Sequence, residues 1–442
     1  MSNMLKNSPK TPKELCNVFF DCEQKNLSLN KTIFNSPVWL YVRSSLYYKL
    51  SVHSGFFNNH HTTSLGLLKV LSLIKNQFKA FLFFNPLVLI LSKKANCVVF
   101  EHPRSKKVDS KNVDIYSHFL VQQLEVAGNK VILLDKGNLG NHDKSYLPNR
   151  YYLDNIELVQ RVVGFFGRYF KRESALFKEE LEYFESKIPG SSCKVQRELD
   201  GAACHFLVGK WFIKIILKWL KPETIYLVDS YSKRHYITSA ARDLNIDVVE
   251  LQHGIVSNYH LGYSFPLITN NCFLPDYFRG WGRAWSKADL AWYNSSYMNS
   301  SFEYLDYLKS QYSLESFEIR SKNVVIVSQG AIGNELSIEI AKRIESFKNL
   351  NVFYKLHPGE FSTYKTFSGY KTLSEQKNFT FITNGDLYDY FKKSNYIVGV
   401  FSTAVLEGVS FGMEPYLVDI SGIEYMEGRL DFKMIDELFQ SV

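Results

Sequence analysis

Several common signatures are missing from this chain of 442 residues. Its six cysteines are scattered without Cys-x-x-Cys spacing, so neither a disulfide framework nor a zinc site is expected. No apolar run reaches the ~20 residues of a membrane-spanning helix, and the polar N-terminus lacks the apolar segment of a secretory signal. No RNP, helix-turn-helix or finger pattern indicates nucleic-acid binding. These absences predict a cytoplasmic protein that uses no metal or other cofactor and binds no nucleic acid.

Length and composition favour two domains with an additional segment. The chain is too long for one ordinary domain, and 45% hydrophobic residues are enough for full cores. Residues 1–95 show no strand–helix alternation and predict a mainly helical, basic N-terminal extension. Alternation then continues through 96–312 and 313–442, which implies parallel sheets covered on both faces. The predicted fold is therefore α/β, with two facing Rossmann-like domains.

The individual elements are predicted from β-forming runs and helical periodicity. Strands are expected at 97–100, 130–134, 224–228, 247–251, 272–274, 277–280, 323–328, 351–356, 380–383, 396–400 and 416–419. Helices are expected at 115–126, 157–187, 206–220, 233–244, 298–312, 335–348, 387–393 and 403–412. The helix at 206–220 is predicted to be buried.

The positive charge is uneven along the chain. Net charge is 52 − 44 = +8, and residues 65–110 alone hold eight Lys/Arg against two acidic residues. Lys69, Lys75 and Lys79 fall between leucines, a pattern typical of a basic amphipathic helix on an anionic membrane surface. The alternative is a helix packed on the first domain with solvated lysines. We expect peripheral contact with the anionic inner face of the cytoplasmic membrane.

Three polar motifs follow predicted strands: Gln252-His253-Gly254, Lys355-Leu356-His357-Pro358 and Phe401-Ser402-Thr403. Ligands of open α/β sheets bind at the carboxyl ends of the strands. Three such ends, in two halves of one chain, predict a ligand cleft between the two domains.

In this order the motifs resemble the GT-B class of glycosyltransferases, in which two Rossmann-like domains hold a nucleotide-sugar between them. The Lys355-x-His357-Pro358 motif with the downstream Ser402-Thr403 pair is similar to that of bacterial capsule and lipopolysaccharide enzymes, such as the sialyl- and Kdo-transferases. His253-Gly254 is similar to the His-Gly of the CDP-glycerol glycerophosphotransferases of teichoic acid synthesis. The resemblance covers roughly residues 96–425. The chain lacks the Asp/Glu-Asp/Glu-Gly motif that supplies the base in several sialyltransferase families.

The resemblance implies a metal-independent glycosyltransferase, and a histidine base would favour inversion. The enzyme would move a sugar from a nucleotide-sugar donor, CMP-, UDP- or similar, to a growing surface polysaccharide or a polyprenyl-linked glycan of a capsule or O-antigen. Two alternatives remain open: a CDP-glycerol-type polyol phosphotransferase, and a protein similar to a UDP-sugar epimerase.

The donor site is expected in the second domain. The resemblance assigns His357 to the donor phosphate, with Pro358 holding the turn and Lys355 helping to orient it. Ser402 and Thr403 stand where a helix begins, so their hydroxyls and backbone N–H groups suit a phosphate; a plain N-cap is compatible with that role.

Four further residues are assigned to the nucleotide. Glu407 lies about one turn into the same helix and is expected to meet the ribose, as an acidic residue does in many GT-B enzymes. Gln329, Gly330 and Gly333 form a flexible loop between a strand and a helix, suited to close backbone approach.

His253 is the favoured general base because it follows a strand of the first domain and its imidazole titrates in a useful range. Its alternative is a structural histidine that caps a turn beside Gly254. Glu250 is expected to orient the histidine or act itself, and Asp229 is the reserve base.

Four residues are assigned to the acceptor. His102 and Arg104 end the first strand and either bind an anionic acceptor or belong to an exposed turn. Tyr259 and His260 follow the Gln-His-Gly turn and either stack on a sugar or pack the loop.

Overall fold

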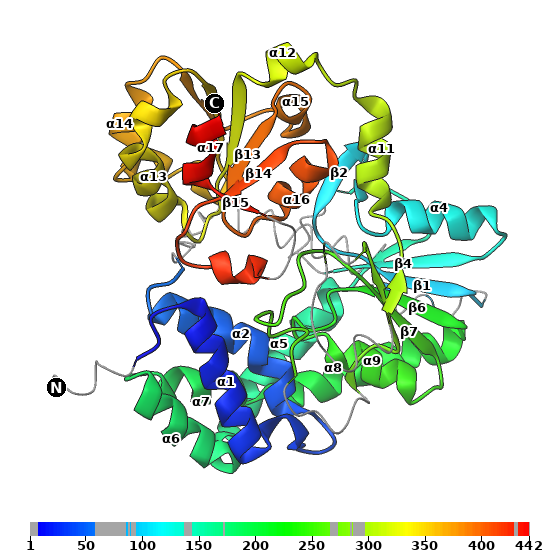
Figure 1. Cartoon of the computed structure of the whole chain (residues 1–442). Coiled ribbons are helices and arrows are strands. Elements are labelled where there is room, and N and C mark those ends of the chain that lie inside the picture. The colour runs from blue at the N-terminus through cyan, green and yellow to red at the C-terminus, as the bar shows by residue number, and fades with distance from the viewer. Residues whose placement is uncertain are drawn as a thin grey trace, which may run out of the picture.

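Two parallel sheets dominate the computed structural model of the chain (Figure 1). The structure describes residues 8–57, 85–86, 89, 94–136, 144–170, 173–265, 273–282, 285, 297–427 and 432–441. The first sheet belongs to the first half of the chain and the second sheet to the second half, and the two halves lie one above the other in Figure 1.

The first sheet has seven strands in the order β5-β4-β1-β6-β7-β8-β9, all parallel. Their bounds are β1 (Cys97–Phe100), β4 (Val131–Asp135), β5 (Arg150–Tyr152), β6 (Thr224–Val228), β7 (Asp247–Leu251), β8 (Tyr277–Gly280) and β9 (Tyr297–Asn299). An antiparallel hairpin, β2 (Ser105–Val108) and β3 (Lys111–Asp114), follows β1. Its turn places Asp109 and Ser110 at positive φ.

The second sheet has six strands in the order β12-β11-β10-β13-β14-β15, also parallel. Their bounds are β10 (Asn323–Val327), β11 (Asn351–Lys355), β12 (Phe379–Ile382), β13 (Tyr396–Gly399), β14 (Glu414–Leu417) and β15 (Lys433–Met434). Apart from the hairpin, the second sheet follows the doubly wound order 3-2-1-4-5-6, and the first sheet has the same order with a seventh strand, β9, added at its edge. The order reverses between β1 and β6 in the first sheet and between β10 and β13 in the second.

Helices cover both faces of the sheets. In the first half they are α4 (His118–Val126), α5 (Asp154–Phe170), α6 (Lys178–Lys187), α7 (Ser192–Leu199), α8 (Ala202–Leu220) and α9 (His235–Arg242). In the second half they are α11 (Glu303–Gln311), α12 (Phe317–Arg320), α13 (Gly333–Lys342), α14 (Tyr370–Ser374), α15 (Tyr388–Phe391), α16 (Thr403–Ser410) and α17 (Ile435–Ser441). Short 3-10 turns include η4 (Glu173–Phe177), η6 (Ile344–Phe347), η7 (Pro358–Glu360), η8 (Tyr364–Thr366) and η9 (Ile423–Met426).

Alternate residues of the buried strands pack on opposite layers. In β1, Val98 and Phe100 belong to a core cluster that includes residues of α8, while Cys97 and Val99 pack with Val121 of α4. This follows from the period of two along a strand, and it explains why a strand buried on both faces contains only apolar residues.

The N-terminal segment is helical where it is described. α1 (Pro12–Asn26), the 3-10 turn η2 (Ser28–Asn30) and α2 (Val38–His53) lie against α6 and α7 of the first half (Figure 1). They also reach the second half: the backbone N–H of Lys13 donates to Glu424 at 2.8 Å, and the ring of Phe57 packs against Phe401. The predicted basic helix around Lys69, Lys75 and Lys79 lies outside the described residues.

The strand predictions are confirmed for all of the long strands, within one or two residues at each end. One helix prediction is wrong in part. α8 was expected to be buried, yet Trp211 and Trp219 are 59% and 55% exposed, because only one side of α8 faces the sheet. The region 157–187 is divided among α5, η4 and α6, and 273–274 is not a strand. The hairpin, β5, α7, β9, α12, β15 and α17 were not anticipated. The helix predicted at 298–312 begins only at Glu303, because β9 occupies the first residues of that range. Within the described residues no helix combines the length and apolarity needed to span a bilayer.

A buried ion pair joins the two N-terminal helices, and it generates a stability prediction. Glu23 and Arg43 are at most 1% exposed; Glu23 accepts from Trp39 at 2.8 Å and Arg43 Nη2 at 2.7 Å, and Arg43 also donates to the carbonyl of Leu261. Arg43→Met leaves Glu23 as an uncompensated charge, so we expect a loss of about 3–5 kcal/mol in the free energy of unfolding.

Denaturant unfolding would measure that loss. The double variant Glu23→Leu/Arg43→Met should recover a large part of it, because it removes both charges from the interior. The matched control is Lys309→Met, which breaks an exposed pair with Asp306 and should cost less than about 1 kcal/mol. An Arg43→Met variant as stable as the control would contradict the prediction.

Candidate functional site

The carboxyl edges of both sheets open onto a cavity of about 1100 Å³, here called the large cavity. The first half contributes the loop after β1 and the start of β2, from Pro103 to Lys106, and the second half contributes the loops after β10, β11, β12 and β13. A neighbouring cavity of about 350 Å³, the histidine cavity, contains His253 and shares Phe401 and Thr403 with the large cavity. Together they form a cleft between the two halves.

Most of the predicted residues lie in this cleft. Those lining the large cavity are Arg104, Gln329, Gly330, Lys355, His357, Pro358, Ser402, Thr403 and Glu407. Those lining the histidine cavity are His253, Tyr259, His260 and again Thr403. His102, Asp229, Glu250 and Gly333 line neither cavity.

His357 is held by the turn that it begins. Its backbone N–H donates to Glu360 at 2.7 Å, and its Nδ1 accepts from the backbone N–H of Gly359 at 3.1 Å. Because Nδ1 is the acceptor, the neutral ring carries its proton on Nε2. Pro358 supplies the first residue of η7, where a missing N–H costs nothing. The imidazole can therefore donate from Nε2 to an anionic oxygen.

Ser402 is the N-cap of α16, as its plain structural reading predicts. Its Oγ accepts from the backbone N–H of Ala404 at 3.3 Å, and Thr403 begins the helix. Gln329, from the loop after β10, accepts from the backbone N–H of Phe401 at 3.2 Å. The side chain of Gln329 thus ties the two strand ends at the second switch point together, and the positive end of α16 faces the large cavity.

Two lysines from opposite halves meet in the large cavity. Burial and the nearby charge of Lys106 both lower the pKa of Lys355, whose Nζ donates to the carbonyl of Gly385 at 3.1 Å. Like charges brought together in this way favour an anion between them. Lys106, on β2, was not among the predicted residues, because the hairpin that carries it was not predicted.

Glu407 lies at the back of the large cavity and is only 3% exposed. Its Oε2 accepts from the hydroxyl of Tyr388 at 2.8 Å. Arg104 of the first half interacts electrostatically with Glu407 and donates from Nη1 to Tyr116 at 2.9 Å. The two predicted residues thus link the halves of the molecule across the cleft.

An aromatic stack surrounds His253. Its ring lies nearly parallel to those of His102 and Tyr231, with centroids 5.5 and 5.7 Å away, and Tyr116 meets it edge-on. Burial lowers the pKa of His102 to about 2, and the neighbouring His253 adds to that effect. His102 Nδ1 accepts from the backbone N–H of Arg104 at 3.0 Å. His102 is therefore a neutral packing surface for His253.

Three hydrogen bonds determine which nitrogen atoms of His253 and His260 carry a proton. His260 Nδ1 accepts from the N–H of Gly262 at 3.2 Å, so the neutral His260 ring carries its proton on Nε2. That Nε2 lies 3.3 Å from the hydroxyl oxygen of Tyr231, and the same hydroxyl lies 3.1 Å from His253 Nε2. The Tyr231 hydroxyl therefore donates to His253. Nε2 of His253 is the basic atom, and its Nδ1 is buried without a hydrogen-bond partner among the described residues.

Asp229 balances the positive charge around this stack. It directly follows β6, at positive φ, and its Oδ1 accepts from the backbone N–H of Ser232 at 3.0 Å. Burial alone would raise its pKa, but His253, Lys136 and Arg234 lower it, so it is a carboxylate. For His253 burial lowers the pKa, and the charge of Asp229 raises it. A proton gained by His253 would therefore be stabilised by Asp229.

Glu250 lies behind the site rather than in it. Its carboxyl group is fully buried and accepts from Ser230 Oγ at 2.6 Å and Tyr263 Oη at 2.8 Å. Burial raises its pKa to about 7. Tyr263 packs edge-on against Tyr231, so Glu250 contacts His253 indirectly, through these two tyrosines.

Gly333 is the predicted residue that the structure removes from the nucleotide loop. It begins α13 and is buried, and a Cβ there would lie 1.9 Å from Oε1 of Glu360. Its small size is needed for packing against the carboxylate that holds His357. Gly333 lies six residues past the end of β10, and sequence alone does not assign a glycine there to a ligand or to packing.

The loop after β12, from Thr383 to Tyr388, was missed although that strand was predicted. The rule that places ligands at strand ends would have included it. The N-terminal helices also contribute Tyr47 and the residues after α2 contribute Phe57 to the histidine cavity, and no local pattern indicates this.

No protein-family model matches the chain, and no curated protein sequence matches it. Solved structures of low identity do match. UDP-GlcNAc 2-epimerase from Methanocaldococcus jannaschii is 9% identical, covers 79% of this chain and 91% of its own, and has a TM-score of 0.45. The Neisseria meningitidis UDP-GlcNAc 2-epimerase, solved bound to UDP-GlcNAc, is 12% identical, with 79% and 90% covered and a TM-score of 0.43. Acinetobacter baumannii MurG is 13% identical, with 75% and 80% covered and a TM-score of 0.40.

Likeness at this level identifies no activity or substrate. The class of fold follows from the strand order: two doubly wound parallel sheets face each other across a cleft, which is the GT-B arrangement. The α/β prediction of two facing Rossmann-like domains with a mainly helical N-terminal extension is confirmed.

The buried carboxyl of Glu250 generates a pH prediction. Its pKa is raised in the folded state from 4.5 to about 7, so over this interval the folded chain keeps a proton that the unfolded chain releases. Stability should therefore fall as pH rises from about 4.5 to 7, by roughly 3 kcal/mol. Glu250→Gln removes this dependence, so the variant should gain stability relative to the wild type over that interval. Melting temperatures of both proteins across the range test this, and parallel curves would contradict it.

Proposed function

We propose that the chain is a metal-independent glycosyltransferase that moves a sugar from a nucleotide-sugar to an acceptor hydroxyl. The observation that carries the proposal is the large cavity at the second switch point. Lys106 and Lys355 approach each other there from opposite halves, beside the N-terminus of α16 and the ring of His357. This is an environment for a phosphate or diphosphate held by cations and helix N–H groups instead of a metal.

In this proposal residues 313–442 form the donor domain and 96–312 the acceptor domain, with 1–95 as an extension. His357 donates from Nε2 to the leaving phosphate, and Lys355 and Lys106 balance its charge. Ser402 and Thr403 present the helix N-terminus to the same group. Gln329 and Gly330 line the same cavity for the nucleotide, and Glu407, at its back, is placed for the ribose.

The transfer itself needs one base. His253 Nε2 takes the proton of the acceptor hydroxyl from the position that the Tyr231 hydroxyl now occupies. The acceptor oxygen forms its bond to the anomeric carbon as the bond from that carbon to the phosphate oxygen breaks, and the nucleotide leaves with the electron pair. Asp229 stabilises the imidazolium that results. Attack from the side opposite the leaving group inverts the anomeric configuration.

The acceptor is proposed to be a growing surface polysaccharide or a polyprenyl-linked glycan of the capsule or O-antigen type. The resemblance of the Lys-x-His-Pro, Ser-Thr and His-Gly motifs supports this choice. Tyr259 and His260, in the histidine cavity, are placed to contact an acceptor sugar, and Arg104 to contact an anionic group near the donor phosphate. The same proposal places the protein at the inner face of the cytoplasmic membrane as a peripheral protein.

Nucleotide binding is the first consequence to test. Among CMP, CDP, UDP and GDP, at least one should raise the melting temperature of the protein, because a ligand that binds only the folded state stabilises it. His357→Ala should weaken that nucleotide roughly tenfold by removing a charge-assisted hydrogen bond.

The matched control is His53→Ala, at the end of α2, whose ring lines neither cavity and bonds the carbonyl of Pro189. It should leave nucleotide binding unchanged. No shift with any of the four nucleotides would overturn the proposal.

Products separate the transferase from its two alternatives. A new phosphodiester in the product, found by mass spectrometry, would assign the chain to the CDP-polyol phosphotransferases. Conversion of a nucleotide-sugar with no acceptor present would assign it to the epimerase-like proteins.

His253→Ala should lower kcat by about 10²–10⁴ while nucleotide affinity stays near that of the wild type, since the base acts on the acceptor. The wild-type rate should fall on the acid side only below pH 6.5, because burial lowers the pKa of His253 from that value. Rates measured from pH 5 to 8 check both points. If the His253→Ala enzyme kept the wild-type kcat, His253 would not be the base and another residue would have to act as one.

A further inference from the structure

The outer face of α5 is unusually apolar for a surface helix. Apart from Ile156, which belongs to the core, its buried side carries small or polar residues, among them Gln160, Gly164 and Gly167. Its exposed side carries the large apolar residues Leu158, Val159, Val162, Phe165, Phe166 and Tyr169. A surface helix normally has the reverse arrangement, with its apolar side toward the core. Neither the fold nor the cleft accounts for this side of α5.

α8 extends the same face. The two helices cross closely at glycines, since a Cβ on Gly201 would lie 2.1 Å from the carbonyl oxygen of Gly164. Beside the crossing, α8 exposes Leu207 and Trp211, and farther along it exposes Trp219. A groove of about 630 Å³ joins Val159 of α5 to Trp211 of α8. Its other lining residues are Leu207, Val208 and Phe212 of α8 and the charged Lys210, Lys214 and Asp243. The exposed apolar residues of the two helices are here called the α5–α8 face.

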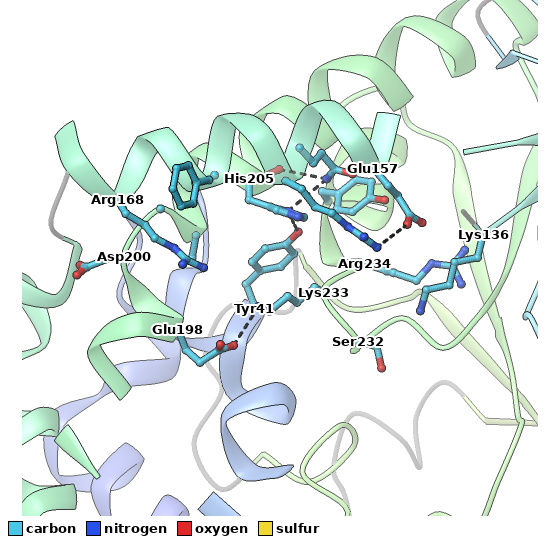
Figure 2. Close-up of a pocket in the computed structure, with 17 residues that line it drawn as sticks. Tyr41, Lys136, Glu157, Arg168, Glu198, Asp200, His205, Ser232, Lys233 and Arg234 are labelled. Carbon is cyan, nitrogen blue, oxygen red and sulfur yellow. Dashed lines mark hydrogen bonds and ion pairs between the residues drawn. The ribbon is translucent and has the colours of Figure 1, made fainter. Parts of the chain in front are cut away.

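A basic cavity of about 430 Å³ adjoins the α5–α8 face (Figure 2). Its lining includes the cations Lys136, Arg161, Arg168, Lys233 and Arg234 and the acids Glu157, Glu198 and Asp200. Figure 2 shows Lys136 toward one end and Arg168 toward the other. Two of the acids are already paired: Glu198 with Lys49 and Lys233, and Glu157 with Arg161 at 3.6 Å on α5. The cations of the lining still outnumber its acids.

Two buried side chains of this cavity have unused hydrogen-bonding atoms. Arg234 is 3% exposed; its Nη1 donates to the carbonyl of Val228 at 2.7 Å, but its Nη2 has no partner among the described residues. Gln160 is fully buried; its Nε2 donates to the carbonyl of His205 at 3.1 Å, but its Oε1 has no described partner. Leaving such groups unpaired is costly, so a polar ligand in the cavity would be favoured.

The arginines lie between the apolar face and the cavity. At 100° per residue, Arg161 and Arg168 stand on the edge of α5 that faces the cavity, next to the exposed Phe165. An anionic group bound there would have its attached chain beside the apolar residues. A membrane lipid has this combination of an acidic head and an apolar tail, whereas a free nucleotide or inorganic phosphate has no use for the apolar face.

The cavity is also adjacent to the cleft. The loop that follows β6 runs between them: Tyr231 lines the histidine cavity, and Ser232, Lys233 and Arg234 line the basic cavity. Lys136 and Arg234 act electrostatically on both Asp229 and His253. A head group in the basic cavity would therefore lie one loop away from the proposed base.

We infer that the α5–α8 face rests in the interface of an anionic membrane and that the basic cavity takes the phosphate or diphosphate of a membrane lipid. The membrane-contacting surface inferred here is formed by described residues of α5 and α8 and is separate from the basic stretch 65–110. It rests on the proposed function only in identifying that lipid with the acceptor.

Vesicle cosedimentation with the full chain tests the inference. The protein should sediment with phosphatidylcholine vesicles that contain phosphatidylglycerol or polyprenyl phosphate, and much less with phosphatidylcholine alone. Phe166→Ser/Trp211→Ser should weaken this binding by about tenfold or more through loss of apolar burial, and Arg161→Gln/Arg168→Gln by a similar factor through loss of charge. All four positions are exposed, so melting temperatures should stay near that of the wild type.

The matched controls are Phe317→Ser, another exposed aromatic on α12, and Lys309→Gln on α11, which should bind vesicles as the wild type does. Wild-type protein that ignores anionic vesicles would overturn the inference. So would a melting shift with inorganic diphosphate that Arg168→Gln abolishes, without vesicle binding, because the ligand would then be a free phosphate. Self-association abolished by Phe166→Ser/Trp211→Ser, again without vesicle binding, would assign the face to a second copy.

Nucleotide melting shifts measured on the same variants separate this inference from the proposed function. Phe166→Ser/Trp211→Ser should keep the wild-type response to nucleotides. Vesicle binding with no nucleotide response would support the membrane surface and overturn the transferase. The reverse result would retain the transferase and overturn the membrane surface.

Discussion

Strand direction is the constraint on which the rest of this structure depends. Every strand of each main sheet is parallel to its neighbours, so all strands of a sheet end at one edge, and loops from distant parts of the chain meet there. The doubly wound order separates the loops after β1 and β6, and those after β10 and β13, because their helices leave to opposite faces. Two such openings face one another, which makes the cleft a consequence of backbone topology. The side chains decide only which chemistry it holds.

The cleft brings together positive charges that the nearby carboxylates do not fully neutralise. On one side the charge of Lys106 lowers the pKa of Lys355, and on the other Lys136 and Arg234 act on the carboxylate of Asp229. Aromatic rings pack on both faces of the partly buried His253, so these charges interact more strongly than they would at the surface. The chain thus holds electrostatic strain that a bound anion would relieve.

The parts of the fold that could be predicted are those where local pattern and burial agree. The strand Cys97–Phe100 and the strand Asp247–Leu251 were predicted with correct bounds because β-branched and apolar residues run together between polar turns. The hairpin Ser105–Asp114 was missed because its polar sequence looks like an exposed turn. α8 was judged buried from composition, yet its tryptophans face outward, and sequence alone does not say how many sides of a helix are covered.

The site divides in the same way. His253, His357 and Ser402 directly follow strands, so the strand-end rule brings them into the cleft. Their partners could not be predicted, because the hydroxyl of Tyr231 and the packing of Gly333 against Glu360 depend on tertiary contacts. Glu250 shows the limit most clearly. Its place beside the histidine in sequence indicated a catalytic carboxylate, while the alternation of side chains along β7 turns it into the interior.

The N-terminal helices have a consequence for how the chain is made. Lys13 in α1 bonds Glu424, 411 positions later, and Tyr47 in α2 contacts the hydroxyl of Tyr425. During synthesis from the N-terminus, these surfaces leave the ribosome before their partners exist. The first half can complete its own core, but the contacts between the first helices and η9 cannot form until Glu424 and Tyr425 have been made. The cleft therefore acquires this wall after both sheets have largely been synthesised.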